Sequence, residues 1–347
     1  MSAWRLRVGI IGAGANTRAK HLPLLRAIPG VEIVAVANRS RESSERVARE
    51  FGISRVAADW REVVEARDID AIVIGTWPYL HAEVTIASLR AGKHVLTEAR
   101  MARDFAEAQT MLEESRRHPH LVAQIVPAPF SLPFDATVME WLRGGRLGAV
   151  REVHATFTHG GLAGPAAPFS WRQDFALSGK NTLFLGIFYE MVRRWLGRDP
   201  ESVVADAAVF TPMRRDERGA EHEVKIPDSV SVLGRYADGA RLVMHLSGVE
   251  TSAPRNEIRV NGSEGAVRAD FATNELWFAV RGQPEQRVEI EPAQRGEWRV
   301  EADFVDSIRE GKPVTLTDFA SGVRYMAFTD AVWESWSRGG ARVALPE

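Results

Sequence analysis

The chain has 347 residues, of which 45% are hydrophobic and 26% charged, the composition of a soluble globular protein long enough for two domains. Its net charge is −2 without a long run of like charges, so neither nucleic acid nor a membrane surface is expected as a partner. The lack of cysteine excludes disulfides, thiolate metal sites and cysteine nucleophiles. No apolar run reaches the roughly 18 residues of a membrane span, and no signal-peptide pattern precedes the first strand, so a cytoplasmic location is expected.

The first half of the chain alternates short apolar runs with amphipathic segments. The apolar runs predict strands at residues 7–11, 31–37, 70–75, 94–97 and 121–126. The amphipathic segments predict helices at residues 18–28, 41–51, 80–91 and 104–117, the last capped by Asp104. Strands that alternate with helices indicate an α/β fold with a parallel, doubly wound sheet. We therefore expect a Rossmann dinucleotide-binding domain over residues 1–126 and a second domain over residues 127–347.

A glycine-containing loop follows the first strand and opens the first helix. Gly12 allows the tight turn, and Gly14 lets a pyrophosphate approach the backbone. The amides at the helix N-terminus, those of Ala15, Asn16 and Thr17, would then bind the phosphates. Thr17 stands where glycine or alanine is usual, and a plain strand-to-helix turn is the alternative interpretation.

The second strand ends in Asn38, Arg39, Ser40 and Arg41. An acidic residue at this place would bond the ribose 2′-hydroxyl and repel a 2′-phosphate, and Asn38 removes that repulsion. Arg39 and Arg41 could pair with a phosphate, to which Ser40 could donate a hydrogen bond. The sequence therefore favours NADP as the cofactor, with NAD as a possibility. The alternative is that both arginines are solvated residues at the start of a helix.

Several segments together resemble one protein family. They are residues 70–76 with 80–83, residues 91–98, Trp171-Arg172 with Ser178-Gly179 and Gly186, residues 262–265, and residues 304–311. These segments resemble the Gfo/Idh/MocA family of nicotinamide-dependent oxidoreductases over nearly the whole chain. The resemblance implies a Rossmann domain followed by an α/β domain with an open, mostly antiparallel sheet. It also implies a small-molecule substrate and a homodimer or homotetramer in which oligomerisation covers the open face of the sheet.

The residues of the second half support that domain independently. Residues 150–159 alternate between apolar and polar side chains, which indicates a half-buried strand. Residues 236–241 carry a hairpin turn signal between two further predicted strands, residues 229–236 and 240–247.

Three positions that carry the family's acid–base chemistry are apolar in this chain. By resemblance, a lysine, an aspartate and a histidine serve hydride transfer in the family, and here their positions hold Ala99, Phe184 and Phe188. Loss of a positioned general acid or base typically costs about 10²- to 10⁴-fold in rate. Phenyl rings also leave sugar hydroxyls unpaired, so a less polar ligand is expected. The alternative is that Phe184 and Phe188 are core residues and the register is off by one or two.

Replacement chemistry would come from other residues of the second domain. The candidates are Lys180, Asn181 and His159, although each could instead be an ordinary surface or structural residue. Asn181 would share a helix face with Phe184 and Phe188 if that helix extends back so far. By resemblance or by position, further residues are expected near the cofactor: Thr76, Trp77, His81, Glu98, Arg100, Trp171 and Arg172. His118 and His120 lack a third ligand, so no metal site is expected.

The sequence leaves three functions open. The first is a nicotinamide-dependent oxidoreductase with relocated or substrate-assisted acid–base chemistry, acting on a less polar carbonyl, alcohol or imine. The second is a catalytically silent nucleotide-binding or regulatory protein on the same fold, suggested by the three lost positions. The third is redox-neutral chemistry with a tightly held nicotinamide that is recycled within each turnover. Glycosidase-like members of the family suggest it, but the expected apolar pocket argues against a sugar substrate.

Overall fold

The computed structural model of the chain describes residues 4–346. These residues form two compact units, one made of residues 4–127 with 299–323 and the other of residues 128–298 with 324–346. Residues 299–323, which our sequence division places in the second domain, thus pack with the first unit. Within the described residues, no helix has the length and hydropathy of a membrane span.

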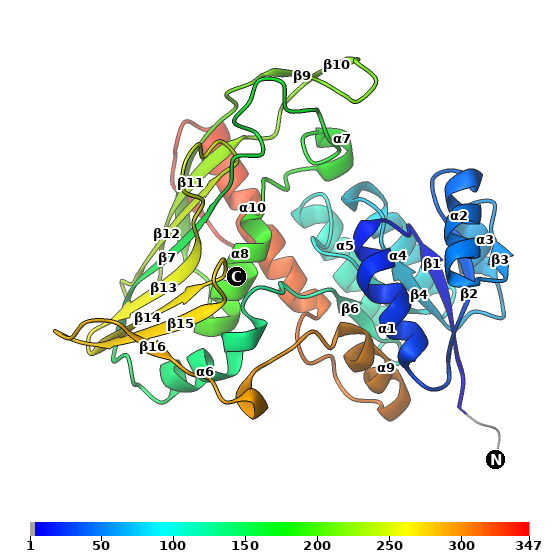
Figure 1. Cartoon of the computed structure of the whole chain (residues 1–347), viewed down its shortest axis with the longest axis horizontal. Helices are drawn as coiled ribbons and strands as arrows, with labels where there is room; N and C mark the ends of the chain where they lie inside the picture. Colours follow the sequence, from blue (N-terminus) through cyan, green and yellow to red (C-terminus); the bar gives the residue numbers. More distant parts are fainter. Residues whose placement is uncertain (1–3, 347) are drawn as a thin grey trace. The chain divides into compact units, whose positions relative to one another are not determined.

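The first unit contains a six-stranded parallel sheet (Figure 1). Its strands, in spatial order, are β3 (Arg55–Val56), β2 (Val31–Ala37), β1 (Leu6–Ile11), β4 (Ala71–Ile74), β5 (His94–Thr97) and β6 (Ala123–Ile125). The order 3-2-1-4-5-6 is that of a dinucleotide-binding Rossmann fold, which confirms the predicted fold class of this unit. The apolar runs form these strands because a parallel sheet is buried on both faces, as in β4, whose four residues are all buried.

Helices connect these strands. They are a π-helical turn (Thr17–His21), α1 (Leu22–Ala27), α2 (Arg41–Phe51), α3 (Trp60–Glu65), a 3-10 turn (Pro78–Leu80), α4 (His81–Arg90) and α5 (Phe105–Arg117). The first unit also contains α9 (Val300–Glu310), which comes much later in the chain and connects none of these strands. Asp104 caps α5 by accepting a hydrogen bond from the Glu107 amide at 2.9 Å, as predicted. The sequence pattern missed β3 and α3, because two and six residues are too short to show a periodicity.

The second unit contains a nine-stranded sheet. Its spatial order is β16 (Gln286–Val288), β15 (Glu275–Val280), β14 (Gly265–Asp270), β13 (Asn256–Gly262), β7 (Val150–Thr158), β12 (Arg241–Ser247), β11 (Ser229–Arg235), β8 (Ser202–Ala208) and β17 (Val343–Ala344). All neighbours are antiparallel except β7 and β12, which run parallel. A separate hairpin is formed by β9 (Met213–Arg215) and β10 (Glu221–Glu223). The expected mostly antiparallel sheet is thereby confirmed.

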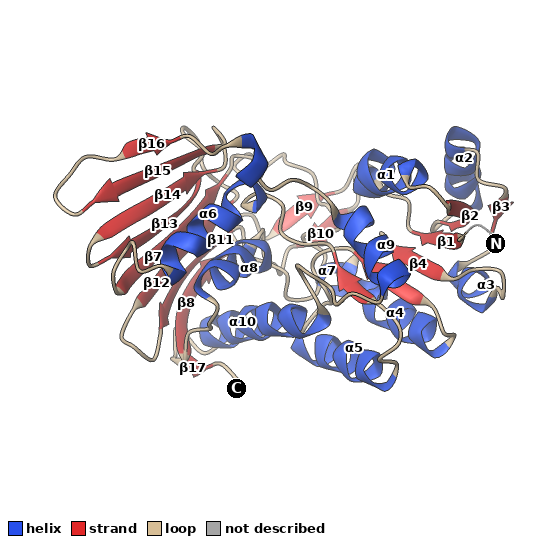
Figure 2. Cartoon of the chain, turned by 90° about the horizontal axis from the view of Figure 1, so that it is seen from below, coloured by secondary structure: helices blue, strands red, loops and turns tan. Residues whose placement is uncertain are grey.

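Helices α6 (Leu132–Arg143), α8 (Leu185–Leu196) and α10 (Phe319–Ser337) lie along one face of this sheet (Figure 2). The first residues of α10 belong to the other unit. The second unit also contains the short helix α7 (Phe175–Ser178) and a 3-10 turn (Pro292–Gln294). Along β11, buried residues alternate with exposed ones, and Leu233 is 56% exposed on the face that the helices leave open.

Candidate functional site

The glycine loop of the first unit brings the ends of three strands together. Gly12 follows β1 with φ +86°, and a Cβ built there would lie 2.5 Å from the Thr76 amide after β4. The Gly12 amide donates to the Ala37 carbonyl of β2 at 2.8 Å. Only glycine tolerates both this backbone conformation and this close approach, so the turn is fixed where the sheet order reverses.

The helix after the loop opens with amides that have no partner inside it. The first backbone bond runs from the Arg18 amide to the Gly14 carbonyl at 3.0 Å, so the amides of residues 15–17 precede the ladder. Such amides form an anion site. Thr17 fits here because Gly75 faces it: a Cβ on Gly75 would lie 2.1 Å from Thr17 Oγ1. The close packing that the third glycine of the motif usually allows is supplied by Gly75 instead.

A pocket of about 530 Å³ lies beside this loop, at the carboxyl ends of β1, β2 and β4. Its lining includes residues from all three strand ends, from α2 and from the start of α3: Gly12, Gly14, Asn38, Arg39, Ser43, Asp59, Trp60, Arg61, Thr76, Trp77 and Tyr79. A crevice at this topological switch point is where open α/β sheets bind ligands. The sequence missed Trp60, Arg61 and Ser43, because the short helix α3 that brings the first two here was not predicted.

Asn38 holds the glycine loop rather than projecting freely into the pocket. Its Oδ1 accepts from the Ala13 amide at 2.6 Å, and its Nδ2 donates to Ser43 Oγ at 3.0 Å. The side chain of Ser40 caps α2 by accepting from the Ser43 amide at 3.3 Å. Asn38 therefore places a neutral, already bonded side chain where an acidic residue would select NAD.

Two arginine side chains stack on indole rings in this pocket. The Arg39 guanidinium lies 5.0 Å from the centre of the Trp77 ring, and that of Arg61 lies 4.3 Å from the Trp60 ring. Arg61 also pairs with Glu83 at 3.0 Å. Stacking orders a guanidinium without using its hydrogen-bond donors, so Arg39 can still bind an anion. Arg41, the other predicted phosphate ligand, instead pairs with Glu45 on α2 and does not line the pocket.

Glu98 follows β5 and belongs to a buried charge cluster. Its Oε1 accepts from Asn16 Nδ2 at 2.5 Å and from His21 Nε2 at 3.0 Å. His21, fully buried on the π-helical turn, also bonds Glu301 on α9 through Nδ1. The contact between His21 and Glu301 is not predictable from the sequence, because 280 residues separate them and no local pattern links them.

The two carboxylates decide the charge of His21. Burial by itself lowers the pKa of the imidazole, but the hydrogen bonds and charges of Glu301 and Glu98 raise it to about 9. Burial favours the protonated form of Glu98, yet its bonds from His21 and Asn16 bring the pKa of this carboxyl below its usual value. At neutral pH the cluster therefore holds an imidazolium and an ionised Glu98.

The charge on His21 makes stability depend on pH in a defined direction. Because the folded pKa of about 9 exceeds the unfolded value of 6.5, the stabilisation is complete below pH 6.5 and is lost as the pH rises to about 9. The loss amounts to roughly 3 kcal/mol. Urea denaturation should show the free energy of unfolding of the wild type falling by this much more than that of His21→Gln between these pH values. Parallel pH curves for the two proteins would contradict a buried imidazolium.

His81 fixes the loop that follows β4. Its Nε2 faces the Thr76 carbonyl at 3.0 Å and its Nδ1 faces the Arg100 carbonyl at 2.9 Å. The ring is buried, and burial lowers its pKa despite these acceptors. His81 thus ties the start of α4 to the segment after Glu98, where the Ala99–Arg100 peptide bond is cis and the Arg100 side chain is buried.

In the second unit, phenyl rings occupy the two positions at which the resemblance leads us to expect an aspartate and a histidine. Phe184 and Phe188 both pack on Phe157, with ring centres 4.6 and 5.2 Å apart respectively, and the cluster continues through Phe130, Phe134 and Phe271. Phe188 is fully buried, as the core interpretation requires, whereas Phe184 is only half-buried. We call these six residues the phenyl cluster. It gives the unit an apolar surface beside His159, whose ring lies 5.5 Å from that of Phe157.

His159 is held as a neutral imidazole with a defined proton position. The Gly161 amide donates to His159 Nδ1 at 3.0 Å, so the ring proton resides on Nε2. Partial burial lowers the pKa of the ring below its usual value. His159 therefore presents a hydrogen-bond donor, Nε2–H, next to an apolar surface.

The loop that contains Gly161 is anchored by a buried arginine. Arg214 of β9 is fully buried and donates to the carbonyls of Leu162 at 2.8 Å and of Gly164 and Ala167 at 3.1 Å each. One guanidinium thus satisfies three carbonyls of an irregular segment, which restricts its conformations. The anchored segment begins directly after Gly161, whose amide bonds His159.

The other predicted residues of this unit have structural partners. Lys180 forms an ion pair with Asp330. Asn181 is buried and donates to the Ser178 carbonyl at 2.7 Å. It lies outside α8, which begins at Leu185 after Leu183 takes a φ of +48°, so Asn181 does not share a helix face with the two phenylalanines. Trp171 carries the guanidinium of Arg172 stacked 4.3 Å from its ring centre.

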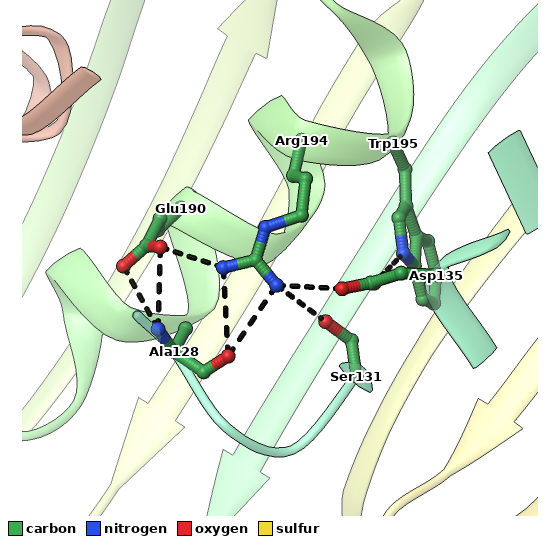
Figure 3. Close-up of polar contacts among 6 residues, drawn as sticks. All are labelled: Ala128, Ser131, Asp135, Glu190, Arg194 and Trp195. Carbon is green, nitrogen blue, oxygen red and sulfur yellow. Dashed lines mark hydrogen bonds and ion pairs between the residues drawn. The ribbon is translucent and has the colours of Figure 1, made fainter. Parts of the chain in front are cut away.

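Glu190 follows Phe188 on α8 but faces a different set of partners (Figure 3). It accepts from the Ala128 amide at 3.2 Å and pairs with Arg194 at 2.6 Å. Arg194 also pairs with Asp135 of α6 at 2.6 Å, and Asp135 accepts from Trp195 Nε1 at the same distance. These charges satisfy each other, so Glu190 is not positioned to replace the missing histidine. Among residues 4–346, no group of three or more His, Cys, Asp or Glu side chains is placed to hold a metal ion.

Comparison with known proteins bears on both units. Residues 6–124 match the model of the GFO/IDH/MocA oxidoreductase family with an NAD-binding Rossmann fold, and residues 136–268 match a GFO/IDH/MocA C-terminal domain. Levoglucosan dehydrogenase of Pseudarthrobacter phenanthrenivorans is 26% identical over 95% of this chain and 96% of its own. Trans-1,2-dihydrobenzene-1,2-diol dehydrogenase of Sus scrofa is 29% identical over 76% of this chain and 73% of its own.

A solved structure of a levoglucosan dehydrogenase in complex with NADH and L-sorbose shares the fold. It matches with a TM-score of 0.88 at 25% identity, over 99% of each chain. The strand order of the first unit and the mostly antiparallel sheet of the second agree with the two family models. The chain therefore belongs to the Gfo/Idh/MocA family and is an oxidoreductase with an NAD-binding Rossmann fold.

Proposed function

We propose that the protein is an NADP-preferring oxidoreductase that acts on a carbonyl, alcohol or imine less polar than a sugar. The observation that carries the cofactor assignment is the pocket beside the glycine loop. A pyrophosphate fits beside the tight turn that only glycine permits at residue 12, where the amides of residues 15–17 can bind it. When bound, the nicotinamide supplies or accepts the hydride.

Preference for NADP rests on the residues after β2. Asn38 is neutral and bonded to the loop, so it neither repels a 2′-phosphate nor offers the carboxylate that NAD-selective sites use. Arg39, stacked on Trp77, supplies a guanidinium with available donors, and the Ser43 hydroxyl lines the same pocket. The nearby carboxylate of Asp59 is occupied, since it caps α3 by accepting from two amides.

Replacing Arg39 with alanine tests this preference. Because a charge-assisted bond to the 2′-phosphate is lost, the dissociation constant for NADP should rise about 10- to 100-fold while that for NAD stays within about threefold. Fluorescence titration with NADPH and NADH measures both. Arg41→Ala is the matched control, since Arg41 pairs with Glu45 outside the pocket. Wild-type protein that binds NADH as tightly as NADPH would defeat the proposal.

Support for a less polar substrate comes from the phenyl cluster. Rings at positions 157 and 184 offer dispersion contacts and no hydrogen bonds, so each hydroxyl of a sugar facing them would cost roughly 1–3 kcal/mol. One relative is named a dehydrogenase of trans-1,2-dihydrobenzene-1,2-diol, a substrate with an apolar ring. We propose that a ring or alkyl group of the substrate packs on Phe184, the half-buried member of the cluster.

In this proposal His159 takes part of the role of the missing acid–base residues. Its Nε2–H donates a hydrogen bond to the carbonyl oxygen and stabilises the negative charge that develops there during reduction. Since Nδ1 is bonded to the Gly161 amide, the neutral ring polarises the oxygen rather than delivering its own proton. Water then supplies the proton that completes the alcohol.

The open face of the nine-stranded sheet suggests how copies associate. We propose a homodimer or homotetramer in which this face is covered, because it exposes Leu233 and leaves alternate residues of β11 in solvent.

A second function, a nucleotide-binding or regulatory protein without turnover, is favoured by a specific observation. The positions of the family's lysine, aspartate and histidine hold Ala99, Phe184 and Phe188, and Lys180 and Asn181 are engaged elsewhere. This alternative requires nucleotide binding without hydride transfer.

A further inference from the structure

The buried cluster around His21 is not explained by cofactor binding through the glycine loop alone. His21 lies one turn after the loop, Glu98 follows β5, and Glu301 lies on α9, so three separate elements of the first unit converge on one imidazole. The His21 ring has no solvent exposure and Glu301 is almost as buried. Burying a charge is costly unless it is paired, and here two carboxylates share one cation.

Both carboxylates can only accept hydrogen bonds when ionised. A neutral imidazole has a single N–H, so only the imidazolium satisfies Glu98 and Glu301 together. The other titratable groups around the cluster are His81, which lies near Glu98, and Asp303, whose carboxyl lies near Glu301 and has a pKa raised by burial. Asp303 cannot carry a positive charge, and burial lowers the pKa of His81, so neither supplies a second cation at neutral pH.

Only one of the two carboxylate oxygens of Glu98 accepts hydrogen bonds from the described residues. Asn16 and His21 both bond Oε1, whereas no described residue donates to Oε2. The side chain of Glu98 is 15% exposed, so it is not sealed off from a ligand. Asn16 is also the residue whose amide stands at the phosphate-binding helix start. The bonds to Oε1 therefore orient Glu98 relative to the pyrophosphate site, and its Oε2 can accept a hydrogen bond from a ligand.

We infer that His21, backed by Glu301, is a positioning residue that locks Glu98 so that its Oε2 accepts a hydrogen bond from a hydroxyl of the nicotinamide ribose. The inference rests on the proposed dinucleotide function. What is new is that the buried imidazolium of His21, acting through Glu98, orients the nicotinamide half of the cofactor. A charged acceptor held by two donors loses no orientational freedom on binding, which favours one placement of the ribose.

Binding of two ligands distinguishes a role of His21 in positioning Glu98 from a role in stabilising the glycine loop as a whole. NADP⁺ carries the nicotinamide ribose, whereas adenosine 2′,5′-bisphosphate carries only the adenosine half with its phosphates. Dissociation constants for both are measured by calorimetry on the full-length wild type, His21→Gln, Glu98→Gln and the double variant. Glu301→Gln retains His21 and tests the same positioning role if His21→Gln does not fold. His118→Gln, a substitution at the C-cap of α5 of a histidine paired with Glu114, is the matched control.

The expected pattern is selective for the nicotinamide half. NADP⁺ should bind about 10-fold more weakly to each single variant, and the bisphosphate within about twofold of wild type. Because both changes remove one interaction, the double variant should be no weaker than either single one. Glu301→Gln should weaken NADP⁺ by about threefold without affecting the bisphosphate.

The other outcomes are distinguishable. If His21→Gln binds NADP⁺ like wild type, or loses both ligands equally, the positioning role is wrong while dinucleotide binding stands. If wild-type protein binds neither ligand, the proposed function itself fails.

Discussion

Replacing His159 with alanine is expected to lower kcat for NADPH-dependent carbonyl reduction by about 10²- to 10³-fold, the usual cost of removing one donor to a developing oxyanion. The Gly161 amide fixes the ring proton on Nε2, and the ring of Phe157, whose centre lies 5.5 Å from that of His159, offers no hydrogen-bond donor. KM should change little, because the bond strengthens mainly in the transition state.

Two further variants sharpen this test. His159→Gln retains an N–H donor and should recover part of the lost rate. His245→Ala, on the open face of the sheet beside Ser231, should have wild-type kinetics. Equal rates for wild type and His159→Ala, measured with a substrate that is turned over, would remove His159 from the mechanism.

Replacing Arg194 with alanine should have the largest effect on stability. Arg194 lies between Asp135 and Glu190, and all three side chains are at most 12% exposed. Removing the cation leaves two buried carboxylates without a counter-charge, which costs about 3–5 kcal/mol. The free energy of unfolding in urea measures this loss.

An exposed pair provides the control for Arg194. Arg215 and Glu221 of the β9–β10 hairpin form a solvent-exposed ion pair, so Arg215→Ala should cost no more than about 1 kcal/mol. Similar losses for Arg194→Ala and Arg215→Ala would show that the buried network does not hold the start of the second unit to α6 and α8.

The fold was predictable from the sequence wherever one local pattern dominated. Fully apolar runs such as β4 and the Asp104 cap of α5 carry their structure in a few consecutive residues. The segment around Asn181 does not, because the left-handed Leu183 ends any helix before α8 and helical spacing gives no sign of it. The two-residue strand β3 is likewise below the length at which periodicity can be read.

The sequence predicted part of the lining of the pocket beside the glycine loop, such as Gly12, Asn38 and Arg39, but it did not predict what these residues bond to. Asn38 was identified as a non-acidic residue after β2, yet its bond to the Ala13 amide depends on the turn at Gly12. Arg41 and Lys180 carry suitable charges, but both are paired with carboxylates that sequence spacing alone does not assign to them. The cluster of His21 and Glu301 is a tertiary contact between distant segments, and a single sequence gives no sign of such contacts.

We propose that this family member transfers hydride although Ala99, Phe184 and Phe188 hold the positions at which the resemblance implies a lysine, an aspartate and a histidine. NADPH deuterated at its transferable C4 position, incubated with the wild-type protein and a panel of aromatic and alkyl aldehydes, ketones and imines, tests it directly by mass spectrometry of the products. The proposal predicts deuterium on the former carbonyl or imine carbon of at least one product, at a rate reduced in His159→Ala. Tight NADPH binding with no deuterium transferred to any compound would contradict it and favour a nucleotide-binding protein without turnover.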